Sequence, residues 1–143
     1  MTIAPFTMPP SGYSATPLIK KLGIAGHMKI LVLNSPDNYF ALLERDIKNQ
    51  LVTENDPVDL VHLFVTSKAA FEKQMKKLSP LYKSNPMMII WVSWYKKSAG
   101  IPTDITEDTI RNYALANGLV DIKVCAVSEI WSGLKLVVPK AKR

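Results

Sequence analysis

Three short, almost wholly apolar segments limit the folds open to this chain of 143 residues more than any other feature. They span residues 28–33, 58–65 and 87–94, and apolar residues at helical spacing separate them. Strands that are apolar on both faces are typical of a parallel sheet covered by helices on both sides. The sequence therefore predicts an α/β fold.

Helical segments are expected before and between these strands. Thr16-Pro17 is typical of a helix start and Gly23 of a helix end, which predicts a short helix there. The apolar pattern over residues 40–51 predicts a helix of about three turns. Residues 51–53 are compatible with a very short strand, but three residues cannot decide this.

Capping residues, prolines and apolar runs predict the elements of the second half of the chain. A helix is expected to begin at Thr66 or Ser67 and to end between Pro80 and Pro86, and another is expected over residues 106–117. Residues 121–127 and 134–138 read as strands joined by a short turn, which makes an antiparallel hairpin. The full prediction is a three-layer, mostly parallel sheet of the Rossmann or methyltransferase-like kind with a C-terminal β-hairpin.

Length and composition favour one domain. We expect a single α/β domain over residues 12–139, a flexible arm over residues 1–11 with three prolines, and a basic tail over residues 140–143. The longest apolar run, residues 87–92, is far below the roughly 20 residues that span a bilayer. The single cysteine, Cys125, excludes an intramolecular disulfide. The N-terminus lacks the pattern of a signal peptide, so we expect a cytoplasmic protein without membrane contact.

The catalytic inventory is small. The two histidines, His27 and His62, have no Cys, Asp or Glu at metal-ligand spacing, and no metal site is predicted. His62 lies in an apolar strand and is expected to be a core residue with satisfied hydrogen bonds. Cys125 lacks a partner and a base, which favours a buried inert thiol.

No cofactor is predicted either. A phosphate-binding fingerprint needs glycines directly after the first strand, and the chain has Asn34-Ser35-Pro36-Asp37 at that place. Gly23 and Gly26 precede the strand instead. Tight binding of a dinucleotide or a triphosphate of the usual kind is therefore not expected.

A ligand site is predicted where the first strand and the strand over residues 87–94 end. If these two strands are neighbours, the loops after them form one crevice. Lysines there suit an anion, and an aromatic side chain offers a flat apolar wall. The candidate ligand-binding residues are Asn34, Ser35, Asp37, Trp94, Lys96, Lys97, Thr103 and Asp104.

The same residues have a purely structural interpretation, which the sequence leaves open. The tryptophans then complete the core, the lysines are solvated, and Asp104 and Thr106 cap a helix. Trp131 has two interpretations as well. It covers the end of the sheet, or it presents an exposed aromatic surface to a partner protein.

Several motifs resemble those of a bacterial family of uncharacterised small proteins, a domain of unknown function. The resemblance covers residues 12–138. It rests on the segments GYSATPL with KLGI (residues 12–24), LFVTS (63–67), WYKK with TD (94–104), and VCA with WSGL (124–134). The chain departs from that family where Tyr95 replaces a proline and where acidic or amide residues are missing near Ile122 and Ser128. The order of elements also resembles a reduced methyltransferase sheet without the acidic, glycine-rich loop that holds S-adenosylmethionine.

Three functional hypotheses follow, in order. The first is a non-catalytic binding or regulatory module for a small anionic ligand or a protein partner. The alternative is a small-molecule enzyme on a methyltransferase-like scaffold, with Asp37 or Asp104 as acid or base and Lys96 or Lys97 holding an anion. The third, which we consider unlikely, is a weak nucleic-acid binder. It would use the basic residues Lys73, Lys76, Lys77, Lys140, Lys142 and Arg143.

Overall fold

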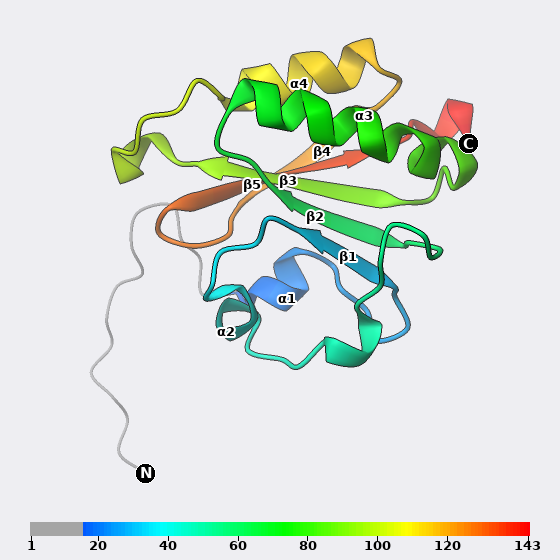
Figure 1. Ribbon diagram of the computed structural model, residues 1–143, viewed down its shortest axis with the longest axis horizontal. Coiled ribbons are helices and arrows are strands. Elements are labelled where there is room, and N and C mark those ends of the chain that lie inside the picture. Colours follow the sequence, from blue (N-terminus) through cyan, green and yellow to red (C-terminus); the bar gives the residue numbers. More distant parts are fainter. Residues whose placement is uncertain (1–15) are drawn as a thin grey trace.

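A five-stranded sheet with helices on both faces forms the centre of the protein (Figure 1). A computed structural model describes residues 16–143. The predicted arm over residues 1–11 and the beginning of the GYSATPL motif lie outside the described residues. The strands are β1 Ile30–Leu33, β2 Leu60–Phe64, β3 Ile89–Tyr95, β4 Val120–Ala126 and β5 Trp131–Val137. The helices are α1 Leu18–Lys21, α2 Tyr39–Leu43, α3 Lys68–Ser84 and α4 Glu107–Ala116, with 3-10 turns at Lys48–Gln50, Lys97–Ala99 and Lys140–Lys142.

The sheet is mixed, so the prediction of a mostly parallel sheet was wrong. Its strand order is β1-β2-β3-β5-β4. β1, β2 and β3 are parallel, whereas β5 runs antiparallel to both β3 and β4. The chain between β4 and β5 is too short for the crossover that a parallel pair needs. The return of β5 between β3 and β4 therefore makes two of the four pairings antiparallel.

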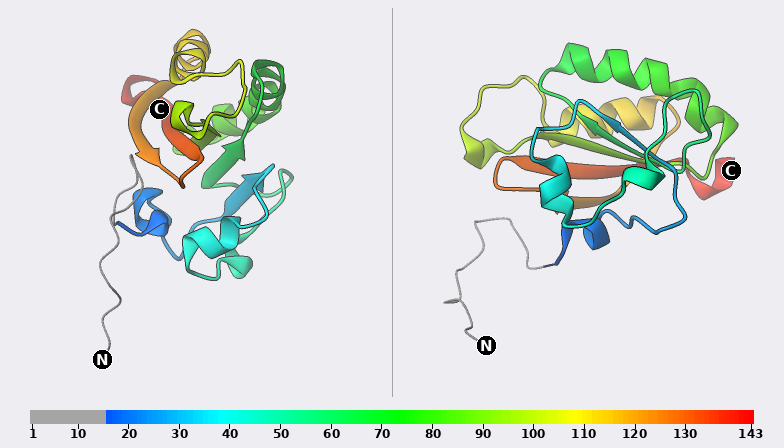
Figure 2. Two further views of the ribbon diagram at one scale, coloured as in Figure 1. Left: turned by 90° about the vertical axis from the view of Figure 1, so that its left-hand side faces the viewer. Right: turned by 60° about the horizontal axis from the view of Figure 1, so that its bottom comes forward.

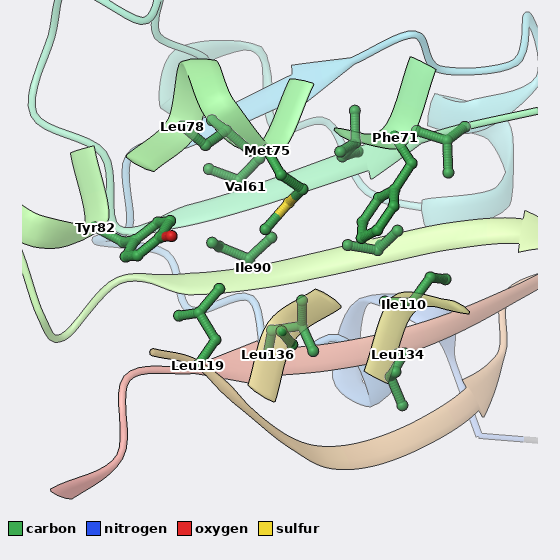
Figure 3. Packing of buried hydrophobic residues seen from close by; sticks show 14 of the residues in the cluster. Val61, Phe71, Met75, Leu78, Tyr82, Ile90, Ile110, Leu119, Leu134 and Leu136 are labelled. Carbon is green, nitrogen blue, oxygen red and sulfur yellow. The ribbon is translucent and has the colours of Figure 1, made fainter. Parts of the chain in front are cut away.

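Helices α3 and α4 cover one face of the sheet (Figures 1 and 2). The Ser67 hydroxyl caps α3 by accepting the Ala70 N–H at 3.2 Å, and Thr106 forms a capping box with Thr109 at the start of α4. Figure 3 shows Phe71 and Met75 of α3 above the apolar side chains of the strands. The larger of the two hydrophobic cores lies on this face, and it is built almost entirely from apolar contacts.

Helix α3 ends where the sequence predicted. Its last residue, Ser84, lies between Pro80 and Pro86, and Pro80 is inside the helix. Proline removes one backbone hydrogen bond, but Tyr82 in the following turn is buried in the core at 4% exposure. That burial holds the last turn in place.

The helix predicted over residues 40–51 was also wrong in length. Helix α2 ends at Leu43, and the following residue, Glu44, adopts a left-handed conformation with φ of 56°. Ile47 is still buried, but it lies beyond the helix. The short strand that the sequence left open is an isolated bridge between Leu51 and Ile30.

The opposite face, covered by α1 and α2, contains a buried series of hydrogen-bonded side chains. His62 is fully buried, its Nδ1 lies 2.9 Å from the Tyr39 hydroxyl, and its Nε2 lies 2.8 Å from the Ser93 hydroxyl. Trp91 donates its indole N–H to the Leu22 carbonyl at 2.9 Å. The prediction that His62 is a core residue with satisfied hydrogen bonds is confirmed. Within residues 16–143, no helix is both long and apolar enough to cross a membrane.

Candidate functional site

A cleft of about 1400 Å³ opens at the carboxyl end of β3, between α1, β4 and the loop that leads to α4. Figure 2 shows this loop projecting beyond the sheet. We call the cleft the lysine cleft, because the described part of the chain contributes five lysines to its lining: Lys20, Lys21, Lys96, Lys97 and Lys123. They come from α1, from the end of β3 and from β4.

A second cleft of about 410 Å³ lies at the carboxyl ends of β1 and β2, and we call it the β1–β2 cleft. Asn34 and Asp37 border it from the loop after β1, and Thr66 borders it after β2. Trp131 and Tyr95 complete the lining, and Tyr95 also lines the lysine cleft. The two clefts are thus neighbours on either side of one aromatic side chain.

The predicted ligand-binding residues are divided between these two clefts. Asn34 and Asp37 border the β1–β2 cleft. Trp94, Lys96, Lys97 and Thr103 line the lysine cleft, whereas Ser35 and Asp104 line neither. The premise that the first strand and β3 are neighbours was wrong, because β2 lies between them. One crevice was expected, and the intervening strand makes two.

Thr103 and Asp104 fasten the loop before α4 to the start of α3. Asp104 accepts the backbone N–H of Lys68 at 2.8 Å. Thr103 donates its hydroxyl to the Thr66 carbonyl at 2.9 Å. Asp104 therefore caps α3, the neighbouring helix, while Thr106 caps α4. The side chains of Thr103 and Asp104 thus hold in place the loop that borders the lysine cleft.

Lys96 has an unusual environment. Its Nζ atom is buried, and no residue of the described chain accepts a hydrogen bond from it. Burial lowers the pKa of this lysine, and the charge of Glu129 opposes that change. The next residue, Lys97, is exposed. The two predicted lysines therefore differ, and only Lys96 holds its ammonium away from water.

Lys21 and Cys125 also line the lysine cleft. Lys21 donates its ammonium to the Ala126 carbonyl at 2.9 Å, and burial lowers its pKa. The charges of Lys96 and Lys123 lower the pKa of Lys21 further, which shows that these ammonium groups act on one another. Cys125 is half-buried, and burial raises the pKa of its thiol, so the thiol stays protonated at neutral pH.

Two carboxylates line the opposite wall, but both are already paired. Glu107 and Asp108, in the first turn of α4, form ion pairs with Arg111, the second at 2.8 Å. Arg111 also binds Asp121 of β4 at 2.9 Å, and these partners raise its pKa. Among the residues that the structure describes, the cleft is lined by five lysines and by two carboxylates that pair with Arg111, so the charge of its lining is positive.

Sequence reasoning did not single out Lys20, Lys21 and Lys123. They lie on α1 and β4, far from β3 in the sequence. Lys21 belongs to the KLGI motif, but no local pattern marks any of the three as a binding residue. Only the tertiary structure brings them to the end of β3.

Trp131 covers the end of the sheet. It is 6% exposed and packs against Tyr95 with ring centroids 4.5 Å apart and against Phe64 at 5.0 Å. Its indole N–H is buried and has no acceptor in the described chain. Across residues 16–143, no three His, Cys, Asp or Glu side chains gather in a way that could hold a metal ion.

No protein-family model matches the sequence, and no curated protein matches it. Solved structures do share its fold. A protein of the NADB-Rossmann superfamily from Streptococcus agalactiae matches with a TM-score of 0.51 and 9% identity, over 90% of this chain and 70% of that one. A proposed tRNA (m1A22) methyltransferase from Streptococcus pneumoniae matches at 0.52 and 10% identity, over 87% and 71%. A proposed type 11 methyltransferase from Sulfolobus solfataricus matches at 0.50 and 16% identity, over 78% and 85%.

These similarities establish a Rossmann-like, methyltransferase-like α/β fold. They contradict our first functional hypothesis, the non-catalytic binding or regulatory module, because the neighbours include proteins of the methyltransferase type. They favour the alternative hypothesis of an enzyme on such a scaffold. Membership of the bacterial family of uncharacterised small proteins is not tested by them and stays a prediction.

The residues after β1 do not fit S-adenosylmethionine, the cofactor that this fold implies. Asn34 adopts a left-handed conformation with φ of 57°, as glycine would, but no glycine follows it to let the backbone approach a ligand. An acidic residue about 20 positions later usually binds the ribose. Here the acidic residues at about that distance, Glu54 and Asp56, lie in the turn before β2, next to residues that bond to Lys29 and Ile30 at the amino end of β1, and Asp56 is engaged with Thr53. We therefore derive no step through that cofactor.

Proposed function

We propose that this protein is an enzyme on a methyltransferase-like scaffold and that it acts on a small anionic molecule in the lysine cleft. The observation that carries the proposal is the convergence of five lysines from separate elements on one cleft. That cleft lies at the carboxyl end of β3, and open α/β sheets bind their ligands at the carboxyl ends of strands. Residues this far apart in the sequence are brought together by the fold itself.

The electrostatics of the cleft support an anionic substrate. Lys20 and Lys97 are exposed at the cleft and attract an anion from solution. Lys96 lies deeper and has no acceptor of its own in the described chain. The half-buried ring of Tyr95 provides an apolar wall beside these charges.

Asp37 is our candidate for the acid or base. The alternative hypothesis named Asp37 and Asp104, but Asp104 accepts a hydrogen bond at the start of α3 and lines neither cleft. Asp37 is exposed and borders the β1–β2 cleft, on the other side of Tyr95. A substrate that extends past Tyr95 reaches both Lys96 and Asp37.

The lysines named for nucleic-acid binding do not contribute to this site. Lys73, Lys76 and Lys77 are exposed on α3, and the basic residues of the tail follow β5. None of them lines the lysine cleft. They offer a matched set of surface lysines for control experiments.

The test is turnover of an unselected pool of substrates. The full chain is incubated with the small-molecule extract of a bacterial cell, with and without added S-adenosylmethionine, and mass spectrometry follows the compounds consumed. We expect the wild type to consume an anionic compound. Lys96→Met is expected to slow this at least about tenfold through the loss of one charged hydrogen bond, and Asp37→Asn to abolish it.

Lys76→Met is the control, because Lys76 is an exposed lysine of α3 outside the cleft. It should turn over the same compound at the wild-type rate. The proposal would be refuted if the folded wild type consumed nothing under either condition, or if the compound consumed were uncharged or cationic.

A further inference from the structure

We propose that Lys96 anchors a phosphate group, so that the lysine cleft selects small phosphorylated molecules. This inference rests on the proposed function, since it names the substrate class of the same cleft. It starts from the buried Nζ of Lys96, which finds no hydrogen-bond acceptor in the described chain. Buried polar groups are almost always paired in proteins, and this exception lies at the lining of the cleft.

A buried ammonium without an acceptor is unfavourable, and the free protein bears that cost. The nearest acidic influence is Glu129, but the ion pairs of the described chain all involve Arg111. The positive charges of Lys96 and Lys21 repel each other, which makes the buried ammonium of Lys96 still less favourable. An anion placed between these lysines relieves both the missing hydrogen bond and the repulsion.

The charge balance favours phosphate over a single carboxylate. Five lysines line the cleft, and its two carboxylates, Glu107 and Asp108, are already paired with Arg111. A phosphate monoester carries about −1.5 to −2 charges at neutral pH and has three strong acceptor oxygens. It can accept hydrogen bonds from more than one ammonium at once, which a carboxylate does less completely.

Lysine suits this role better than a rigid donor would. Its ammonium is a compact charge with three N–H donors on a flexible stem of four carbons. Rotation about that stem brings Nζ from its buried position to an anion in the cleft. The backbone of Lys96 is fixed meanwhile, because its N–H donates to the Ile130 carbonyl at 2.9 Å.

The proposal predicts that Lys96 lowers the stability of the free protein and raises that of the bound protein. We compare thermal unfolding of the full chain and of Lys96→Met in chloride, inorganic phosphate and succinate at equal ionic strength. In chloride, Lys96→Met should unfold at a higher temperature than the wild type. At a phosphate concentration about 100 times its Kd, the wild-type midpoint should rise by roughly 5–10 °C.

The variant should lose at least about half of that rise, and calorimetry should show inorganic phosphate binding about 10- to 100-fold more weakly to it. Lys76→Met, with its exposed lysine on α3, should respond to phosphate as the wild type does. Equal phosphate stabilisation of wild type and Lys96→Met would overturn the role of Lys96. Equal stabilisation by succinate would overturn the choice of phosphate.

These outcomes are separate from those of the proposed function. Phosphate binding that depends on Lys96, in a protein that consumes nothing, would keep this inference and refute the enzyme. Turnover of an anion that does not depend on Lys96 would keep the enzyme and refute this inference.

Discussion

The two faces of the sheet solve the same packing problem in different ways. Helices α3 and α4, of 17 and 10 residues, cover one face and bury side chains such as Phe71 and Ile110. Helices α1 and α2, of four and five residues, cover the other, where His62 and Ser93 are buried among apolar side chains. One face is held mainly by apolar contact area, and the other adds fully buried hydrogen bonds between side chains.

The length of the helices explains the difference. A helix of four or five residues contributes little stability of its own and presents few side chains to a sheet. Directional bonds fix the short helices instead. The indole of Trp91 donates to the Leu22 carbonyl directly after α1, and Tyr39 of α2 reaches His62 in β2. Short covering elements thus depend on specific polar partners in the strands beneath them.

The largest expected loss of stability comes from a substitution on the apolar face, which α3 and α4 cover. Phe71→Ala removes a fully buried ring of α3 that packs edge-on against Tyr113 at 5.1 Å. We expect the free energy of unfolding to fall by about 3–5 kcal/mol, because the lost apolar contacts leave a cavity. Chemical denaturation measures this. A loss below about 1 kcal/mol would show that area does not dominate this face.

The second effect is a pH dependence that only the polar face should produce. Burial lowers the pKa of His62 from 6.5 to about 3. Between these values the unfolded chain holds more protons than the folded one, so the free energy of unfolding falls as pH falls. We expect a loss of about 1.4 kcal/mol per pH unit below the ordinary histidine pKa, or roughly 2.7 kcal/mol over two units.

His62→Gln isolates this contribution, because glutamine keeps hydrogen-bonding groups and does not titrate. Denaturation at a series of pH values should give a shallower acid slope for the variant than for the wild type. Identical slopes would mean that the buried imidazole is not what makes the polar face sensitive to acid.

The smallest effect is a matched pair of tyrosine substitutions. The Tyr39 hydroxyl is buried, burial raises its pKa, and its hydrogen-bond partner within residues 16–143 is His62. Tyr39→Phe leaves the Nδ1 atom of His62 without its hydrogen-bond partner and should cost about 1.5 kcal/mol. Tyr82→Phe, on the apolar face, removes only a part-buried contact of 3.3 Å to the Asn117 carbonyl and should cost less than about 0.5 kcal/mol. Equal losses would contradict the contrast between the faces.

The local patterns predicted most of the elements correctly in kind. Apolar runs located β1, β2 and β3, because a strand buried on both faces needs few polar residues. Ser67 and Thr106 located the starts of α3 and α4, since their side chains bond to the first turn of the helix. Pro80 and Pro86 bounded the end of α3, and the burial of Tyr82 continues the helix past Pro80 to Ser84.

The site was predicted only in pieces. Lys96 and Lys97 were recognised because they follow β3 directly. Asn34 and Asp37 were placed in the same crevice as those lysines, but the position of β2 separates them. Strand order depends on which apolar faces pack together, and the sequence near Asn34 does not predict it.

The sequence by itself determined that the chain is α/β, where its main strands and helix starts lie, and that His62 belongs to the core. These properties are local, since they follow from side-chain period, caps and burial along one segment. The tertiary structure alone decided that the sheet is mixed, that two clefts replace one, and that Lys20, Lys21 and Lys123 join Lys96. Charges from distant segments become one site only when the packing of the sheet sets the distances between them.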